Sequence, residues 1–253
     1  MHWPFALAKG SPFPAPVENR LGYDAARYAA VWKAMETAVG AGKTRAIGTS
    51  NMTARKLTDL LKTCAIKPAV NQVESHPFLS QAKELAWLTA QGIVMTAYSC
   101  VGGKGQEGRC TPPAQAKCAH SHPPTHPRTH APCCALCAPG RPLGSPDRPA
   151  RLVEEGDPAP LHDDVIKAIA AKHSVEPAQV LIRWQMQRGV VVIPKSVTPA
   201  RIASNLAATA LTLDAADLAA IAALDKGLRL IKGYPWLREG ETWQALWDLD
   251  FLA

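Results

Sequence analysis

The chain has 253 residues and a formal net charge of +7. Residues 100–141 carry +4 of that charge, from five basic residues and one acidic residue, so the rest is nearly balanced and has no basic stripe for nucleic-acid binding. No apolar run approaches the ~20 residues that cross a bilayer, and residues 1–4 do not resemble a signal peptide. These features predict a cytoplasmic protein, or a plastid protein whose transit peptide is missing.

Strands and helices alternate through the first hundred residues. Capping residues and apolar residues at helical spacing mark the helices, while short β-branched runs that end in polar side chains mark the strands. Because this alternation is typical of a parallel sheet, function is expected at the carboxyl ends of the strands. The predicted helices span residues 24–40, 53–63 and 81–91, and the predicted strands span residues 43–51, 70–77 and 93–99.

Residues 100–141 differ in composition from the rest of the chain. They contain seven Pro, five Gly, four His and six of the seven Cys, but no aromatic Phe, Trp or Tyr. Such a segment cannot bury a core, so we expect it to be disordered. The spacing of its His and Cys residues matches no common zinc template, and no metal site is predicted. Residues 1–99 and 142–253 are therefore expected to form two parts of one fold, separated by an insertion.

The alternation resumes after residue 160, with predicted helices at residues 161–173, 176–188 and 214–224. Residues 190–193 are four β-branched residues in a row, which predicts a parallel strand that is covered on both faces. Pro194 ends this strand, and Pro199 stands where the next helix begins.

Polar side chains gather between that strand and that helix. Two cations, two hydroxyl groups and a helix N-terminus at one end of a sheet can form an anion-binding site. An ordinary strand, turn and helix with surface charges is the alternative interpretation of the same spacing. The residues concerned are Lys195, Ser196, Thr198, Arg201 and, four residues after the arginine, Asn205.

This stretch, together with earlier segments, resembles the aldo-keto reductases, a family of NADP(H)-dependent (β/α)8 barrels. The matching segments are residues 193–205, Gly48-Thr-Ser-Asn51, Asn71-Gln72 and Tyr98-Ser99, the last continued by Pro142-Leu-Gly-Ser145 once residues 100–141 are removed. The resemblance implies an α/β fold, a partial barrel with roughly strands four to eight and their helices.

The resemblance also assigns the contacts with the cofactor. It implies that Lys195 and Arg201 hold the 2′-phosphate of NADP(H), and that Tyr98 stacks on the nicotinamide. Ser50, Asn51 and Gln72 are the implied partners of the nicotinamide carboxamide. The adenosine end is implied to be lined by Ser196, Val197 and Thr198, with Asn205 at the adenine. The loop over the pyrophosphate is implied to contain Ser99, Leu143 and Ser145. Ser204 stands where the family often has a glutamate, so one adenine contact is missing.

Residues 2–4 read His-Trp-Pro, which resembles the end of the fourth barrel strand in the family and implies that His2 lies beside the reacting carbonyl. A neutral imidazole can donate a hydrogen bond to the negative charge that develops there. Barrel strands one to three, and with them the family's catalytic Tyr, Asp and Lys, have no counterpart, and Tyr28 belongs to a helix. We therefore expect open sheet edges and a chain that folds poorly or aggregates.

The leading prediction is NADPH-dependent reduction of an aldehyde, aldose or ketone, with this chain inactive if its catalytic Tyr, Asp and Lys are absent. One alternative is a catalytically silent cofactor-binding or structural protein. Another is a fragment from a faulty gene model, in which residues 100–141 are translated intron or an insertion specific to one lineage. The tail residues Trp236, Trp243 and Trp247 either shape the substrate pocket or pack the tail down. The carbonyl substrate and the oligomeric state stay open.

Overall fold

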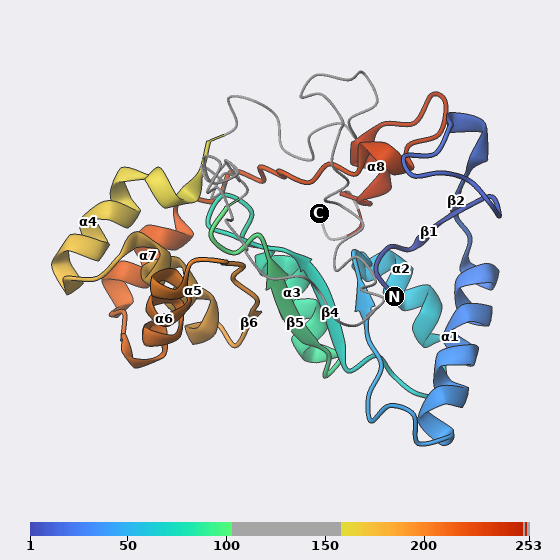
Figure 1. Ribbon diagram of the computed structural model, residues 1–253, viewed down its shortest axis with the longest axis horizontal. Helices are drawn as coiled ribbons and strands as arrows, with labels where there is room; N and C mark the ends of the chain where they lie inside the picture. Colours follow the sequence, from blue (N-terminus) through green and yellow to red (C-terminus); the bar gives the residue numbers. More distant parts are fainter. Residues whose placement is uncertain (103–157, 250, 252–253) are drawn as a thin grey trace, which may run out of the picture.

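The computed structural model describes residues 1–102, 158–249 and 251 of an α/β fold (Figure 1). The strands are β1 (Phe5–Leu7), β2 (Arg20–Tyr23), β3 (Thr49–Ser50), β4 (Val70–Glu74), β5 (Val94–Tyr98) and β6 (Val191–Val192). The helices are α1 (Ala25–Gly40), α2 (Ala54–Leu61), α3 (Ala82–Ala90), α4 (Asp164–His173), α5 (Pro177–Gln187), α6 (Pro199–Ala207), α7 (Ala215–Ala222) and α8 (Trp243–Leu246). Short 3₁₀ helices span Val17–Asn19, Pro160–His162, Ala208–Ala210 and Tyr234–Trp236. Most of the predicted insertion lies outside the described residues.

The helices begin where the sequence places their caps. Asp24, Thr53 and Asp214 precede α1, α2 and α7, and each side chain accepts a hydrogen bond from a backbone N–H of the first turn. Such a bond satisfies one of the donors that a helix leaves free at its N-terminus. The predicted helices are thus confirmed to within a few residues. Among the described residues, no helix has the length and apolar composition that crossing a bilayer requires.

Strands β3, β4, β5 and β6 form one parallel sheet in that order. The register aligns Ser50 with Gln72, Gln72 with Thr96 and Thr96 with Val191, so these side chains share one face of the sheet. The alternate residues, such as Val73 on β4 and Ala97 on β5, face the helices and are buried. The parallel sheet confirms the predicted fold class at this level.

Strand β6 corrects the prediction of a strand covered on both faces. Val190 is buried at 2% exposure, but Val191 and Ile193 are 48% and 46% exposed. Val190 and Val192 pack on the helix side, while Val191 and Ile193 point to the opposite face, where Val94 is also 43% exposed. Among the described strands, β6 pairs only with β5, so the β-branched run marks a strand that is buried on one face.

The N-terminal segment also differs from the prediction. Residues 1–4 form no strand, so the expected strand ending at His2 is wrong. A single hydrogen bond between backbone atoms joins this segment to the sheet, from the Met1 amino group to the Gly48 carbonyl oxygen (2.9 Å). Strands β1 and β2 instead form an antiparallel hairpin that the sequence analysis did not predict. In Figure 1 this hairpin lies beside α8.

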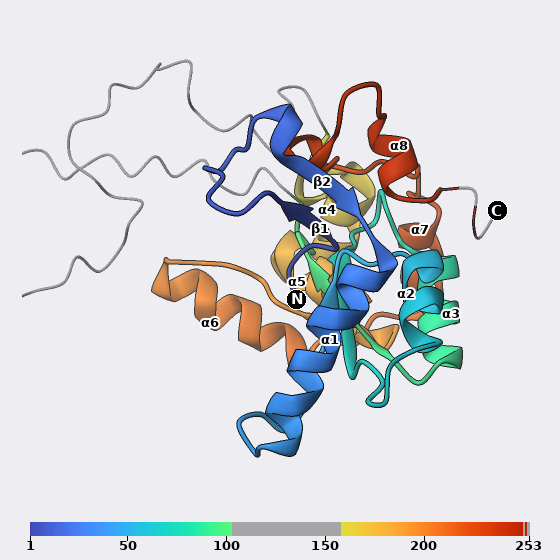
Figure 2. The same ribbon diagram turned by 90° about the vertical axis from the view of Figure 1, so that its right-hand side faces the viewer.

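Two clusters of buried apolar side chains hold the helices in place. The first lies between the sheet and α1, α2 and α3, and it includes Trp32, Leu57 and Leu88. The second, which includes Ile166 and Trp184, packs α4, α5 and α7 together. Val101 packs against both clusters. Helix α6 buries no residue, and Figure 2 shows it at the side of the molecule, away from α2, α3 and α8.

Tryptophans dock the C-terminal tail onto the N-terminal segment. The Trp236 ring lies 5.6 Å from that of Trp3 and 6.1 Å from that of Phe5, between ring centroids. Trp247 is 5% exposed, its ring lies 5.8 Å from that of Trp3, and its indole N–H donates to the Lys232 carbonyl oxygen. Aromatic pairs at these separations are stabilising beyond their buried area. For Trp236 and Trp247, packing of the tail is therefore the role that these contacts support.

Gly48 lies directly before β3 and close to Val70 of β4, and we predict that Gly48→Ala destabilises the fold. A Cβ atom at Gly48 would lie 2.5 Å from Val70 Cγ2 and 3.0 Å from the Val70 carbonyl oxygen. The strands would have to separate, at a cost of about 1–3 kcal/mol in the free energy of unfolding, measurable by urea denaturation. Gly40→Ala is the matched control, because nothing lies within 4 Å of that position in α1. Equal effects of the two substitutions would contradict this account.

Candidate active site at the carboxyl ends of the parallel strands

Asn51 joins the ends of three strands. It follows β3 in a left-handed conformation (φ 57°), which asparagine tolerates better than most residues, and its backbone N–H donates to the Gln72 carbonyl oxygen (2.9 Å). Its side-chain oxygen accepts from the Tyr98 hydroxyl at 2.8 Å, and its Nδ2 donates to the His2 carbonyl oxygen at 2.9 Å. Ser50 Oγ donates to the same Gln72 carbonyl at 2.7 Å. These bonds bring together five of the predicted site residues.

The side chains in this group differ in whether they can form a hydrogen bond with a ligand. Both functional groups of the Asn51 amide are hydrogen-bonded within the protein, and burial raises the pKa of the Tyr98 phenol. No described residue forms a hydrogen bond with the side-chain amide of Gln72, which is half-buried. The His2 side chain is exposed. An incoming polar group can therefore meet the Gln72 amide without breaking an existing bond.

A buried carboxylate lies directly beyond Gln72 on the same face of β4. Glu74 is fully buried, and it accepts hydrogen bonds from the backbone N–H groups of Leu230 (2.7 Å) and Ile231 (3.1 Å). His76 Nε2 lies 3.1 Å from one of its oxygens and Arg229 Nη1 lies 3.5 Å from the other. Glu74 and Arg229 were not predicted from the sequence. The available signal was a charged residue at the end of an otherwise uncharged strand.

The predicted phosphate-binding residues lie on a separate part of the same sheet edge. Lys195 and Arg201 are exposed, on the loop after β6 and on α6, and no described residue forms an ion pair with either. Ser196 Oγ accepts from the Thr198 backbone N–H at 3.1 Å, which shapes the turn before α6, and Asn205 is half-buried. Val197 is 80% exposed. No hydrogen bond among the described residues links this group to Asn51.

The remaining predicted site residues are only partly described. Ser99 follows β5 in a left-handed conformation (φ 52°), and its carbonyl oxygen accepts from the Gly102 N–H at 2.8 Å. Leu143 and Ser145 lie outside the described residues, so their predicted place in the loop over the pyrophosphate stays a prediction. Tyr28 is buried within α1, as the sequence indicated.

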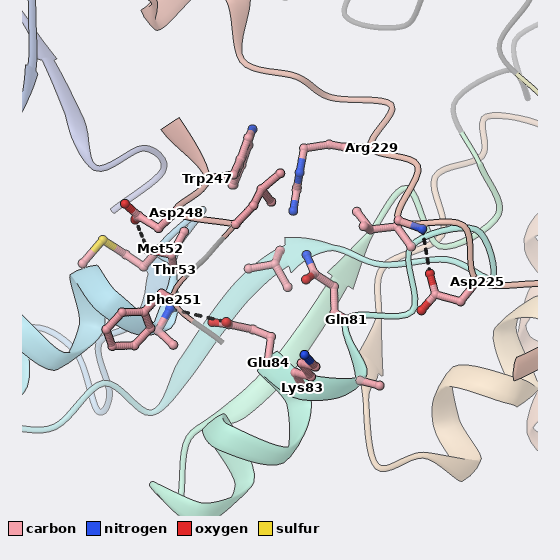
Figure 3. Close-up of a pocket in the computed structure, with 16 residues that line it drawn as sticks. Met52, Thr53, Gln81, Lys83, Glu84, Asp225, Arg229, Trp247, Asp248 and Phe251 are labelled. Atoms are coloured by element: carbon pink, nitrogen blue, oxygen red, sulfur yellow. Dashed lines mark hydrogen bonds between the residues drawn. The ribbon is translucent and has the colours of Figure 1, made fainter. Parts of the chain in front are cut away.

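A cavity of about 390 Å³ lies on the other side of β4, against the helices and the C-terminal tail (Figure 3). Glu84 of α3 is 8% exposed there, and one of its oxygens accepts weakly from the Ala54 N–H (3.3 Å). Burial raises the pKa of Glu84 to about 7. The tail closes the cavity through Asp248, which pairs with the buried ammonium of Lys56 and with Arg55 (2.7 Å). Sequence analysis did not predict this cavity.

The sequence of the chain is similar to those of known proteins. The model of the aldo/keto reductase family matches residues 1–226. The chain is 36% identical over 232 residues to aldo-keto reductase family 1 member A1 of Sus scrofa, covering 91% of this chain and 58% of that protein. It is also 36% identical over 250 residues to the aldo/keto reductase slr0942 of Synechocystis sp., covering 98% of this chain and 64% of that protein.

The chain belongs to the aldo/keto reductase family. Its match spans about three-fifths of the length of these relatives. In this chain, the residues joined by Asn51 lie at the carboxyl ends of parallel strands, which is where α/β proteins of this layered type place their sites.

Glu84 makes stability depend on pH, and Glu84→Gln tests this dependence. Its folded pKa of about 7 lies above its ordinary value of 4.5, so its stabilising contribution is complete below about pH 4.5 and is lost as the pH rises through about 7. Between about pH 5 and about pH 8, the wild-type chain should lose about 2–3 kcal/mol relative to Glu84→Gln, measured by urea denaturation. Parallel pH profiles for the two chains would show that the carboxyl titrates normally.

Proposed function

We propose that this aldo/keto reductase binds NADP(H) along the carboxyl edge of its parallel sheet and reduces an aldehyde, aldose or ketone. The observation that carries the proposal is the hydrogen-bonded group at Asn51, which holds Ser50, Gln72 and Tyr98 side by side at the ends of three adjacent strands. Family membership supports oxidoreduction of carbonyl compounds. We further propose that the four-stranded sheet corresponds to part of a (β/α)8 barrel.

The residues present fit the proposed cofactor at both ends. At the nicotinamide end, the unbonded amide of Gln72 can pair with a carboxamide, and the Tyr98 ring is held by its hydroxyl bond to Asn51 so that one face can stack. At the adenosine end, Lys195 and Arg201 are two cations without ion pairs among the described residues, which suits a phosphate dianion. The exposed Val197 offers apolar contact beside them.

When bound, NADPH supplies the hydride. The chain's own residues orient the two reactants: the Tyr98 ring and the Gln72 amide fix the face of the nicotinamide, and His2 donates a hydrogen bond to the carbonyl oxygen as negative charge develops there. We assign no proton donor in this chain, because Tyr28 is buried in α1 and the Tyr98 hydroxyl is bonded to Asn51. A cofactor-binding protein without turnover is the second candidate for that reason.

Measuring both binding and turnover separates these candidates. The purified chain is titrated with NADPH by calorimetry, and NADPH oxidation is then followed at its absorbance band with a panel of aldehydes, aldoses and ketones. Binding with carbonyl-dependent oxidation supports a reductase, and binding alone supports the silent protein. Absence of NADPH binding would overturn the proposal.

The phosphate-binding pair predicts how the chain distinguishes NADPH from NADH. The double substitution Lys195→Met and Arg201→Leu should weaken NADPH binding by about 10–100-fold, since charge-assisted bonds to the 2′-phosphate are lost, and should leave NADH binding unchanged. Lys33→Met, which removes an exposed cation from α1, is the matched control. Equal loss of affinity for both cofactors would show that the pair does not contact the 2′-phosphate.

A further inference from the structure

One carboxylate fastens the C-terminal tail to the start of α2. Asp248 accepts a hydrogen bond from Thr53 Oγ1 at 2.5 Å (Figure 3). It also pairs with Arg55 Nε (2.7 Å) and with the ammonium group of Lys56. The Lys56 side chain is 2% exposed and also donates to the Leu246 carbonyl oxygen (2.9 Å). A buried cation needs its partner, so these bonds fix the tail at this point.

The residue before Asp248 carries this attachment to the N-terminal segment. Trp247 is 5% exposed, and its ring centroid lies 5.8 Å from that of Trp3 and 3.8 Å from the Arg229 guanidinium. Trp236, also in the tail, lies 5.6 Å from the Trp3 ring. Trp3 directly follows His2, and the rings of these two residues lie 6.1 Å apart. The tail therefore packs against the neighbour of the predicted catalytic histidine.

The sheet itself holds His2 by few contacts. Residues 1–4 form no strand, and two hydrogen bonds join them to the described part of the sheet edge: Met1 N–H to the Gly48 carbonyl oxygen, and Asn51 Nδ2 to the His2 carbonyl oxygen. Both bonds end on main-chain atoms of the segment. The His2 side chain is exposed and forms no hydrogen bond with a described residue. Its direction therefore depends on how the following residue is packed.

We propose that Asp248 is a positioning residue for the reductase reaction. By holding Trp247 in place it keeps Trp3 packed, and with it keeps His2 at the end of β3 beside Asn51. This inference rests on the proposed function, in which His2 donates to the substrate carbonyl. The bonds of Asp248 go to Thr53 and to the side chains of Arg55 and Lys56, none of which is a predicted cofactor residue. Its loss should therefore affect catalysis and leave cofactor binding unchanged.

The order of the Trp3 backbone amide tests this role without any cofactor. It is measured by 15N relaxation on the full 253-residue chain labelled with 15N-tryptophan, and the signal is assigned by its absence from Trp3→Phe. We expect an order parameter of about 0.85 in the wild-type chain and one below about 0.6 in Asp248→Asn. If Asp248 stabilised the tail alone, the two bonds from the end of β3 would keep Trp3 ordered in that variant.

A second variant guards against a chain that fails to fold. Asp248→Asn leaves the buried Lys56 without its carboxylate, whereas Lys56→Met combined with Asp248→Asn removes both charges. The double variant should fold and show the same loss of order at Trp3. Glu241→Gln is the matched control, because it removes a tail carboxylate that pairs with the exposed Arg238 and not with α2. It should leave Trp3 as ordered as in the wild-type chain.

NADPH titration and turnover separate this inference from the proposed function. The double variant should bind NADPH within about twofold of the wild-type affinity, measured by calorimetry. Its kcat for carbonyl reduction should fall about 10–100-fold, because the hydrogen-bond donor to the carbonyl is displaced. A wild-type chain that binds no NADPH overturns the proposed function alone. If NADPH binds without turnover, the order of Trp3 alone decides whether Asp248 positions the His2 segment.

Three results overturn the positioning role. The first is equal order of the Trp3 amide in the wild-type chain and in the double variant. The second is the same loss of order in Glu241→Gln, which would show that any change in the tail disturbs the segment. The third is an unchanged kcat in a variant whose Trp3 has lost its order.

Discussion

The burial of one carboxylate governs how this chain is assembled. Glu74 ends the central strand β4 at zero exposure, where an ionised group without partners would be strongly destabilising. Two backbone N–H groups from residues 230 and 231, together with Arg229, satisfy it. The segment after α7 must therefore cross the end of the sheet at this point. That crossing brings Arg229 under the Trp247 ring and directs the rest of the tail toward the N-terminal segment.

Strand β4 consequently separates two environments. On one face Gln72 lies beside Ser50 and Thr96, next to the Asn51 group at which we propose the nicotinamide binds. On the other face Val73 lines the cavity that the tail closes. Because the period of a strand is two residues, adjacent positions on β4 face these two environments. The first environment is the one that we propose for the cofactor, and residues of the C-terminal tail line the second.

The sequence predicted what local patterns control and missed what distant contacts control. Capped helices such as α1 and α2 could be placed because Asp24 and Thr53 act within their own first turn. The candidate site residues at the ends of β3, β4 and β5 were predicted from the family resemblance, and their roles stay predictions. The β1–β2 hairpin and the Glu74–Arg229 pair could not be predicted, because each depends on segments that meet only after folding. The exposure of Val191 and Ile193 was missed because a β-branched run shows that a strand forms, but not how many of its faces are covered.

The two apolar clusters have a consequence for how the chain opens. Helices α4, α5 and α7 pack mainly on one another. The two-residue ladder Thr96–Val191 and Ala97–Val192, together with hydrogen bonds from Gln185 to Ser75 and from Arg188 to Ser80, joins this part of the chain to the rest of the sheet. Units of a protein that have their own apolar clusters can exchange their amide protons through separate local openings, at free energies below that of global unfolding. Lys195 belongs to one unit and Gln72 to the other. A molecule that contacts both residues would bind only when the two units are packed together. Its binding would therefore raise the free energy of each local opening, and the two units would unfold as one.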